Sequence, residues 1–193
     1  MKDLNENFRF SRYENSFIWL KEAGVALPVY CVQEPELPLL LSKSTNLFKL
    51  FLSDVGLLAS MYVDGLQLKI LSREKDINFG AIYENVAAQE LKAHGFELYY
   101  FNSKKQGELD FVIEYKGNVL PLEIKSGKAY TRHNALDNVL KEEKYAIPQA
   151  FVFCNKNIST QEKIAYLPIY MIGFLEKEKI EEYIYSIDLS ALQ

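Results

Sequence analysis

The sequence predicts an α/β fold built on a mixed sheet, and three observations in its second half support this class. A periodic pattern of apolar residues predicts a helix from Asn78 to the glycine at Gly95. Three runs with strand character follow it, FELYYFNS, ELDFVIEY and VLPLEIKS. A polar helical stretch around Asn134 to Lys144 then leads into the apolar run QAFVFC. The resulting order, α-β-β-β-α-β, is typical of helices packed on a sheet with mixed strand directions.

The residues before this core predict a few further elements. An amphipathic helix is expected over Arg12 to Gly24, because apolar residues recur there at helical spacing and the stretch ends in a glycine. The run VALPVYCV predicts a strand, and LFKLFLSDVGLLASMYV predicts a strand that passes into a short helix at Ser53 or Asp54. Leu66 to Asp76 is expected to be a connection. In the tail, IAYLPIYMIGFL predicts a strand and a helix whose order the pattern leaves open.

The change in pattern predicts two parts, residues 1–74 and residues 75–193. One helix, a hairpin and a second helix enclose little core, so the first part is expected to be a segment cut from something larger. The second part is long enough to bury a core of its own.

Composition limits the possible functions. Hydrophobic residues make up 49% of the 193 residues and charged residues 25%, which is typical of a globular protein. The formal net charge of −4 excludes a polycation that would coat nucleic acid. No apolar run approaches the length of a membrane span, and the polar N-terminus lacks the apolar segment of a signal peptide. With only Cys31 and Cys154, far apart in sequence, a reduced cytoplasmic location is expected.

The stretch GELDFVIEYKGNVLPLEIKSGK places charges inside two predicted strands. Because strand side chains alternate between faces, Asp110 is expected opposite the face shared by Leu109 and Phe111, while Glu123 and Lys125 share one face of the next strand.

The turn between these strands is expected to set their register. The dipeptide Gly117-Asn118 suits a type II′ turn, which prefers glycine first. That turn places Asp110 opposite Lys125 and diagonal to Glu123, all on one face of the sheet.

Two neighbouring carboxylates stay ionised together most readily around a cation, and hard oxygen ligands suit Mg²⁺ or Mn²⁺. A lysine beside them can orient or deprotonate a water, or neutralise charge on a phosphate. This chemistry is that of phosphodiester hydrolysis. The same three residues could instead form a salt-bridged cluster on a solvated sheet face, and their spacing leaves both interpretations open.

The quoted motifs add a resemblance. GELDFVI followed by LPLEIKSGK resembles the acid and E-x-K core of the PD-(D/E)xK nuclease superfamily, with Asp110 as the motif aspartate and Glu123-Ile124-Lys125 as E-x-K. The preceding GAIYENVAAQEL and HGFELYY resemble a helix and strand of archaeal-type Holliday-junction resolvases, which makes Glu84 the helical acid. The sequence departs from the superfamily name, because Leu109 rather than proline precedes Asp110.

The chain is similar more closely to a C-terminal domain of unknown function found behind AAA+-type ATPase domains. FKLFLSDVGLLAS, GAIYENVAAQEL, YYFNSKKQGELDFVI and LEIKSGK carry this likeness. It implies a restriction-endonuclease-like αβββαβ core preceded by a partial winged-helix-like segment, and an ATPase domain as partner. No G-x-x-x-x-G-K-[S/T] loop occurs in the sequence, so this chain is not expected to hydrolyse ATP.

The resemblance also implies roles for single residues. Asp110, Glu123, Glu84 and the carbonyl of Ile124 would bind Mg²⁺ or Mn²⁺, and Lys125 would position the attacking water on a DNA substrate. The alternative is a catalytically inactive nuclease-like module that mediates protein interaction or regulates its ATPase.

Other polar residues keep two interpretations each. The basic residues that flank the predicted site in sequence could contact phosphates or form a solvated rim; they are Lys104, Lys105, Lys128 and Arg132. Glu108 could be an extra ligand or an exposed charge at a strand end, and Glu90 could face inward in place of Glu84. His94 and His133 have no partners at zinc spacing, so no zinc site is expected.

Overall fold

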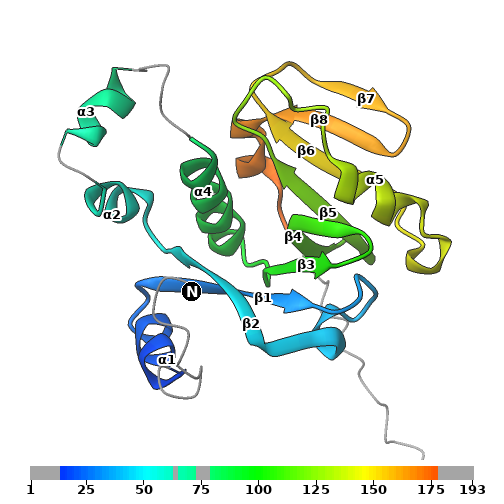
Figure 1. Ribbon diagram of the computed structural model, residues 1–193, viewed down its shortest axis with the longest axis horizontal. Helices are drawn as coiled ribbons and strands as arrows, with labels where there is room; N and C mark the ends of the chain where they lie inside the picture. Colours follow the sequence, from blue (N-terminus) through cyan, green and yellow to red (C-terminus); the bar gives the residue numbers. More distant parts are fainter. Residues whose placement is uncertain (1–13, 63–64, 73–78, 178–193) are drawn as a thin grey trace, which may run out of the picture.

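The computed structural model describes residues 14–62, 65–72 and 79–177, which form a mixed α/β structure around one sheet (Figure 1). Within these residues the sheet has eight strands in the order β2-β1-β3-β4-β5-β6-β8-β7. The strands are β1 (Ala26–Val32), β2 (Lys43–Leu52), β3 (Tyr99–Ser103), β4 (Gly107–Tyr115), β5 (Asn118–Ile124), β6 (Ala150–Cys154), β7 (Ser159–Gln161) and β8 (Ile164–Pro168). The α-helices are α1 (Glu14–Glu22), α2 (Val55–Ser60), α3 (Leu66–Leu71), α4 (Gly80–Ala93) and α5 (Asn134–Lys141). Short 3-10 helices are η3 (Leu39–Ser42), η4 (Glu143–Tyr145) and η5 (Ile169–Phe174).

Strand directions are mixed, as the sequence predicts. β3, β4 and β5 form an antiparallel meander, while β1 runs parallel to β3, and β5, β6 and β8 run parallel to one another. The order α4-β3-β4-β5-α5-β6 repeats the predicted α-β-β-β-α-β. The tail contributes β8 followed by η5. The predicted α/β class with a mixed sheet is therefore confirmed.

Helices α4 and α5 cover opposite faces of the sheet (Figure 1). Ala87 and Leu91 of α4 are buried in one hydrophobic core with residues such as Phe111, which we call the α4-side core. Leu136 and Val139 of α5 are buried in a second one, the α5-side core. The side chains of central strands are thus buried on both faces, which explains why they read as near-continuous apolar runs.

The β4–β5 turn differs from the prediction. Tyr115 pairs with Asn118, so the loop is Lys116-Gly117, and both loop residues have positive φ, at 50° and 70°. Two positive φ values in a two-residue loop define a type I′ turn, whose twist matches that of the flanking strands. The Asn118 side chain also donates a 2.9 Å hydrogen bond to the carbonyl of Lys116. The predicted loop Gly117-Asn118 and its register are wrong.

A β-bulge in β4 produces a second difference. Tyr99 of β3 faces Val112, whereas Phe101, two residues further on, faces Leu109, so β4 carries an extra residue between these pairs. Leu109 and Val112 are consequently both buried in the α5-side core, while Phe111 is buried in the α4-side core. The prediction that Leu109 shares a face with Phe111 is wrong, because a bulge interrupts strand alternation.

The described N-terminal helix α1, strand β1 and helix α2 form where the sequence predicts them, whereas β2 begins at Lys43, before the predicted run LFKLFL. The carboxylate of Asp54 accepts a 2.8 Å hydrogen bond from the Leu57 amide and caps α2. The expected connection over Leu66 to Asp76 contains the helix α3. The predicted domain boundary between residues 74 and 75 lies outside the described residues, as do Arg12 and Tyr13 at the start of the first predicted helix.

The hairpin β1–β2 belongs to the same sheet as the predicted core, because Tyr30 of β1 pairs with Tyr99 of β3. Helix α4 is attached to this hairpin through the buried side chain of Asn85. Its amide oxygen accepts a 2.8 Å hydrogen bond from the Leu52 N–H, and its nitrogen donates a 2.9 Å bond to the Leu52 carbonyl. Asn85 thus fixes α4 to the end of β2. None of the described helices is both long and hydrophobic enough to span a membrane.

Candidate functional site

Asp110 and Glu123 come together where the ladder between β4 and β5 ends. The last ladder pair is Phe111 with Leu122, and one further step in that register sets Asp110 opposite Glu123. The Asp110 carboxylate accepts a 2.8 Å hydrogen bond from the main-chain N–H of Ile124. The Asp110 side chain thus takes the place of a main-chain carbonyl of β4 as the acceptor for this N–H. We call Asp110 and Glu123 the acid pair.

The electrostatics of the acid pair are dominated by the burial of Glu123. Only 3% of Glu123 is exposed. Burial, followed by the charge of Asp110 and a hydrogen bond to it, raises the pKa of Glu123 to about 8, although Lys125 acts in the opposite direction. Two carboxylates packed this closely favour a state in which one of them holds a proton or a cation neutralises them.

Lys125 supplies a cation beside the acid pair. Its Nζ lies 3.0 Å from Oε2 of Glu123, and 27% of its side chain is exposed. Its main-chain N–H donates a 2.8 Å hydrogen bond to the carbonyl of Phe153, which holds the end of β5 against β6. Burial lowers the pKa of Lys125, but the carboxylates of Glu123, Asp110 and Glu84 together outweigh burial and raise it.

Glu84 reaches toward the same site from α4. Burial raises its pKa, with Asp110 adding to that effect and the cations of Lys49 and Lys125 opposing it. The sequence-predicted acids therefore interact. Among the described residues, however, no group of three or more His, Cys, Asp or Glu side chains is gathered in a way that could hold a metal ion. The acid pair offers oxygen donors of the kind that suit a divalent cation.

Lys49 of β2 is part of this neighbourhood, although sequence reasoning did not single it out. Its Nζ lies 2.6 Å from Oε1 of Glu108 and 5.1 Å from the centre of the Tyr100 ring, and the side chain is 22% exposed. Asn102 donates a 2.8 Å hydrogen bond to the other oxygen of Glu108. Glu108 is thus an exposed, paired charge. The one signal for Lys49 in the sequence is a lysine within the apolar strand LFKLFL.

A polar bridge joins α4 to the strand ends near Lys125. The Asn155 amide donates a 3.2 Å hydrogen bond to the carbonyl of Ser126, the residue that follows Lys125. The Tyr83 hydroxyl, next to Glu84 in sequence, lies 3.4 Å from the amide of Asn155. Sequence reasoning missed this bridge, because Asn155 comes to this edge of the sheet only through the parallel pairing of β5 with β6.

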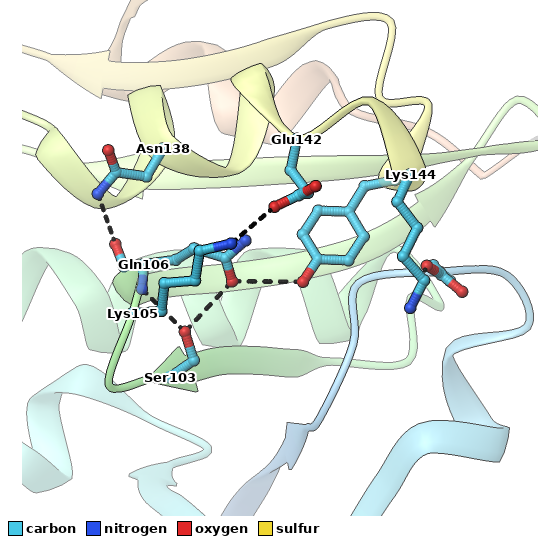
Figure 2. Close-up of polar contacts among 8 residues, drawn as sticks. Ser103, Lys105, Gln106, Asn138, Glu142 and Lys144 are labelled. Carbon is cyan, nitrogen blue, oxygen red and sulfur yellow. Dashed lines mark hydrogen bonds and ion pairs between the residues drawn. The ribbon is translucent and has the colours of Figure 1, made fainter.

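The four basic residues proposed as phosphate contacts are exposed. Lys105 lies 3.2 Å from a carboxylate oxygen of Glu142, just beyond the end of α5 (Figure 2). Beside it, the buried Gln106 accepts a hydrogen bond from the Ser103 hydroxyl and, through its main-chain carbonyl, another from Asn138 (Figure 2). This network attaches the β3–β4 turn to α5.

The remaining candidates lie elsewhere. The carboxylate of Glu90 faces η5, because a Cβ at Gly173 would lie 4.0 Å from Glu90 Oε2. Nδ1 of His94 lies 2.7 Å from the carbonyl of Leu175. The buried ring of His133 lies 2.9 Å from Asp137 and 2.8 Å from the Tyr166 hydroxyl. Both histidines therefore make contacts within the fold.

The arrangement combines the buried Glu123, the partly buried Asp110 and the neighbouring Lys125 at one edge of the sheet with a third acid, Glu84, on α4. Such a set can bind a cation through oxygen, hold a water near a cation, and offset negative charge on a phosphate. No curated protein and no solved structure matches the chain. Residues 79–172, which carry Glu84, Asp110, Glu123 and Lys125, match the family described as Domain of unknown function (DUF4143).

Proposed function

We propose that residues 79–172, together with the hairpin that carries Lys49, form a metal-dependent DNA phosphodiester hydrolase of the PD-(D/E)xK kind. The observation that carries this proposal is the acid pair at the end of the β4–β5 ladder, with Lys125 3.0 Å from Glu123. The element order from α4 to β6 and the mixed sheet are compatible with the restriction-endonuclease-like core that the motifs imply.

The roles of the residues follow from their positions. The acid pair and the carbonyl of Ile124 would hold Mg²⁺ or Mn²⁺, and Glu84 would complete the shell directly or through water. When bound, such an ion would lower the pKa of a water and offset charge on the phosphoryl oxygens. Lys125 would orient the attacking water and balance negative charge on the substrate. The hydrogen bond from the Ile124 N–H keeps the Asp110 carboxylate at the site.

The setting of this activity is also a proposal. The motif resemblance supports an AAA+-type ATPase domain as the partner of this domain. The buried Cys31 and Cys154 are free thiols, which supports a reduced, cytoplasmic location.

A second candidate function is an inactive nuclease-like module that binds other proteins or regulates its ATPase. A first observation that favours it is that the described acids do not gather into a three-ligand group. Exposed apolar side chains such as Trp19, which is 75% exposed, also occur on α1 and suit a protein contact.

Cleavage of a DNA panel separates the two functions. Linear, supercoiled, single-stranded and branched DNA would be incubated with Mg²⁺ or Mn²⁺ and with wild type, Glu123→Gln or Lys125→Ala. Lys92 and Glu97 form an exposed ion pair of similar length, 2.8 Å, so Glu97→Gln and Lys92→Ala are matched controls. A metal-dependent nuclease loses cleavage in the two site variants alone. Equal cleavage, or none, in all five folded proteins would overturn the catalytic proposal.

A further inference from the structure

An open pocket of about 400 Å³ lies at the ends of β6 and β8, beside the candidate site. Its polar and aromatic lining includes Asn155, Lys156, Asn157 and Tyr170. We call it the strand-end pocket. Because β5, β6 and β8 are parallel, their carboxyl ends meet at one edge of the sheet. Glu123 lies at the carboxyl end of β5, and Lys125 directly follows its last residue. Crevices outside the carboxyl ends of strands are where open α/β sheets commonly bind ligands.

Asn155 lines the strand-end pocket and also contacts residues beside the candidate site. Its amide donates to the carbonyl of Ser126, directly after Lys125, and lies 3.4 Å from the hydroxyl of Tyr83, directly before Glu84. A molecule seated in the pocket would therefore adjoin the residues proposed to act on a phosphodiester. The pocket extends from there toward η5, which packs beside α4 (Figure 1).

The lining of this pocket has the chemistry that a nucleotide needs. Tyr170 is 71% exposed, so its ring is available for stacking on a base. Asn155 and Asn157 provide amides that can hydrogen-bond to base edges, and Lys156 provides a cation for a phosphate. A volume of several hundred Å³ is in the usual range for a small-molecule site.

We propose that the strand-end pocket binds one unpaired nucleotide next to the phosphodiester that the candidate site cleaves. This inference rests on the proposed function and narrows its substrate class. A base within a duplex has both faces covered by its neighbours, whereas an unpaired base can stack on an aromatic side chain. The substrate is therefore DNA with a single-stranded segment, such as an overhang, flap or branch.

Binding and cleavage are measured separately to test the inference. Fluorescence anisotropy with Ca²⁺ in place of Mg²⁺ reports binding of a labelled single-stranded oligonucleotide and of a duplex with an overhang. Tyr170→Ala should weaken binding of both about 5- to 150-fold, as expected for the loss of one stacked base, while Tyr170→Phe should preserve it. Lys156→Gln should reduce the slope of log affinity against log salt by about 0.7.

Phe174→Ala is the matched control. Phe174 is an aromatic residue of the same 3-10 helix, is 74% exposed and does not line the pocket, so its loss should leave binding unchanged. Equal affinities for wild type, Tyr170→Ala and Phe174→Ala would overturn the pocket as a nucleotide site.

The outcomes distinguish this inference from the proposed function. Binding that depends on Tyr170 without any cleavage would support the pocket and overturn catalysis. Cleavage that depends on Glu123 with no contribution from Tyr170 would support catalysis and overturn the pocket. A folded wild type that neither binds nor cleaves any DNA would overturn both.

Discussion

The main-chain N–H of Ile124 donates a 2.8 Å hydrogen bond to the carboxylate of Asp110, at the point where the ladder between their two strands ends. The proposed motif aspartate therefore has a structural role as well as a chemical one. The Asp110 carboxylate takes the place of a main-chain acceptor for Ile124, which is 6% exposed.

Two substitutions of Asp110 should separate these roles. Asp110→Ala leaves the Ile124 N–H without its acceptor and should lower the free energy of unfolding by about 1 to 3 kcal/mol. Asp110→Asn keeps an oxygen acceptor, so it should unfold near the wild-type urea midpoint while removing the negative charge. Urea denaturation followed by circular dichroism provides the measurement. Equal losses in the two variants would show that the charge, and not the hydrogen bond, stabilises this strand end.

Glu123→Gln should change how stability depends on pH. The pKa of Glu123 is raised from 4.5 to about 8 in the folded protein, first by burial and then by Asp110. The folded state thus binds the proton more tightly than the unfolded chain, so this stabilising contribution is complete below pH 4.5 and is lost as pH rises through 8. Thermal unfolding in EDTA should show wild type losing stability relative to Glu123→Gln over that range, with a slope of at most about 1.4 kcal/mol per pH unit. Parallel curves would contradict the raised pKa.

The charge of Lys49 on β2 should influence the pKa of Glu84 on α4. Lys49 lowers the pKa of Glu84 and Glu108 raises it. Lys49→Gln should therefore move that pKa further up, whereas Glu108→Gln should move it down. Titration of the Glu84 carboxyl carbon by NMR measures both shifts. Shifts of the same sign in the two variants would exclude direct charge interactions as their cause.

Asn85→Ala should destabilise the protein more than an exposed asparagine substitution. The variant leaves both the N–H and the carbonyl of Leu52 without the partners that Asn85 provides, which should cost roughly 2 to 4 kcal/mol. Asn102→Ala, which removes an exposed side-chain contact, is the control. Chemical denaturation of the two variants gives the comparison, and similar midpoints would show that water replaces the lost bonds.

Gly107→Ala should lower the free energy of unfolding for two reasons, the backbone conformation of Gly107 and the close approach of Ala135. Gly107 has φ of 98°, and a Cβ there would lie 3.0 Å from the Cβ of Ala135 in α5. We expect a loss of about 1 to 3 kcal/mol. Gly117 also has positive φ, at 70°, but no atom lies within 4 Å of an added Cβ. Gly117→Ala therefore measures the cost of the backbone conformation alone. A midpoint for Gly107→Ala no lower than that for Gly117→Ala would show that α5 moves aside without cost.

Local sequence patterns were sufficient to predict the order of elements from α4 to β6, but they did not predict α3 or β7, and they left the order of the tail open. The spacing of apolar residues indicated the helix α4, and Gly95 indicated where it ends. Apolar runs with strand character indicated β4 and β5. These patterns could not fix the register of β4 with β5. Two dipeptides that differ by one position, Gly117-Asn118 and Lys116-Gly117, are both plausible two-residue turns. The bulge near Asp110 likewise depends on how β3 pairs with β4, which no single strand specifies.

The candidate site was predictable only in part, for a related reason. Asp110, Glu123 and Lys125 lie on adjacent strands joined by a hairpin, so their proximity follows from local connectivity. Lys49 and Asn155 arrive through the parallel pairings of β1 with β3 and of β5 with β6, which link distant parts of the chain. Asn85 is a polar residue on the buried face of α4, where the apolar pattern predicts hydrophobic side chains. Its partners are the main-chain N–H and carbonyl of Leu52, at the end of β2.

The parallel pairing of Tyr30 with Tyr99 also bears on how the chain folds during synthesis. The β1–β2 hairpin can form from local contacts as soon as it leaves the ribosome, but its other edge can be paired only after α4 and β3 have been translated. Closing that long loop should limit the folding rate, since non-local strand pairing requires entropy to be lost before contacts form. Until then the open edge of β1 is a template for aggregation, and we expect the nascent chain to depend on a chaperone during that interval.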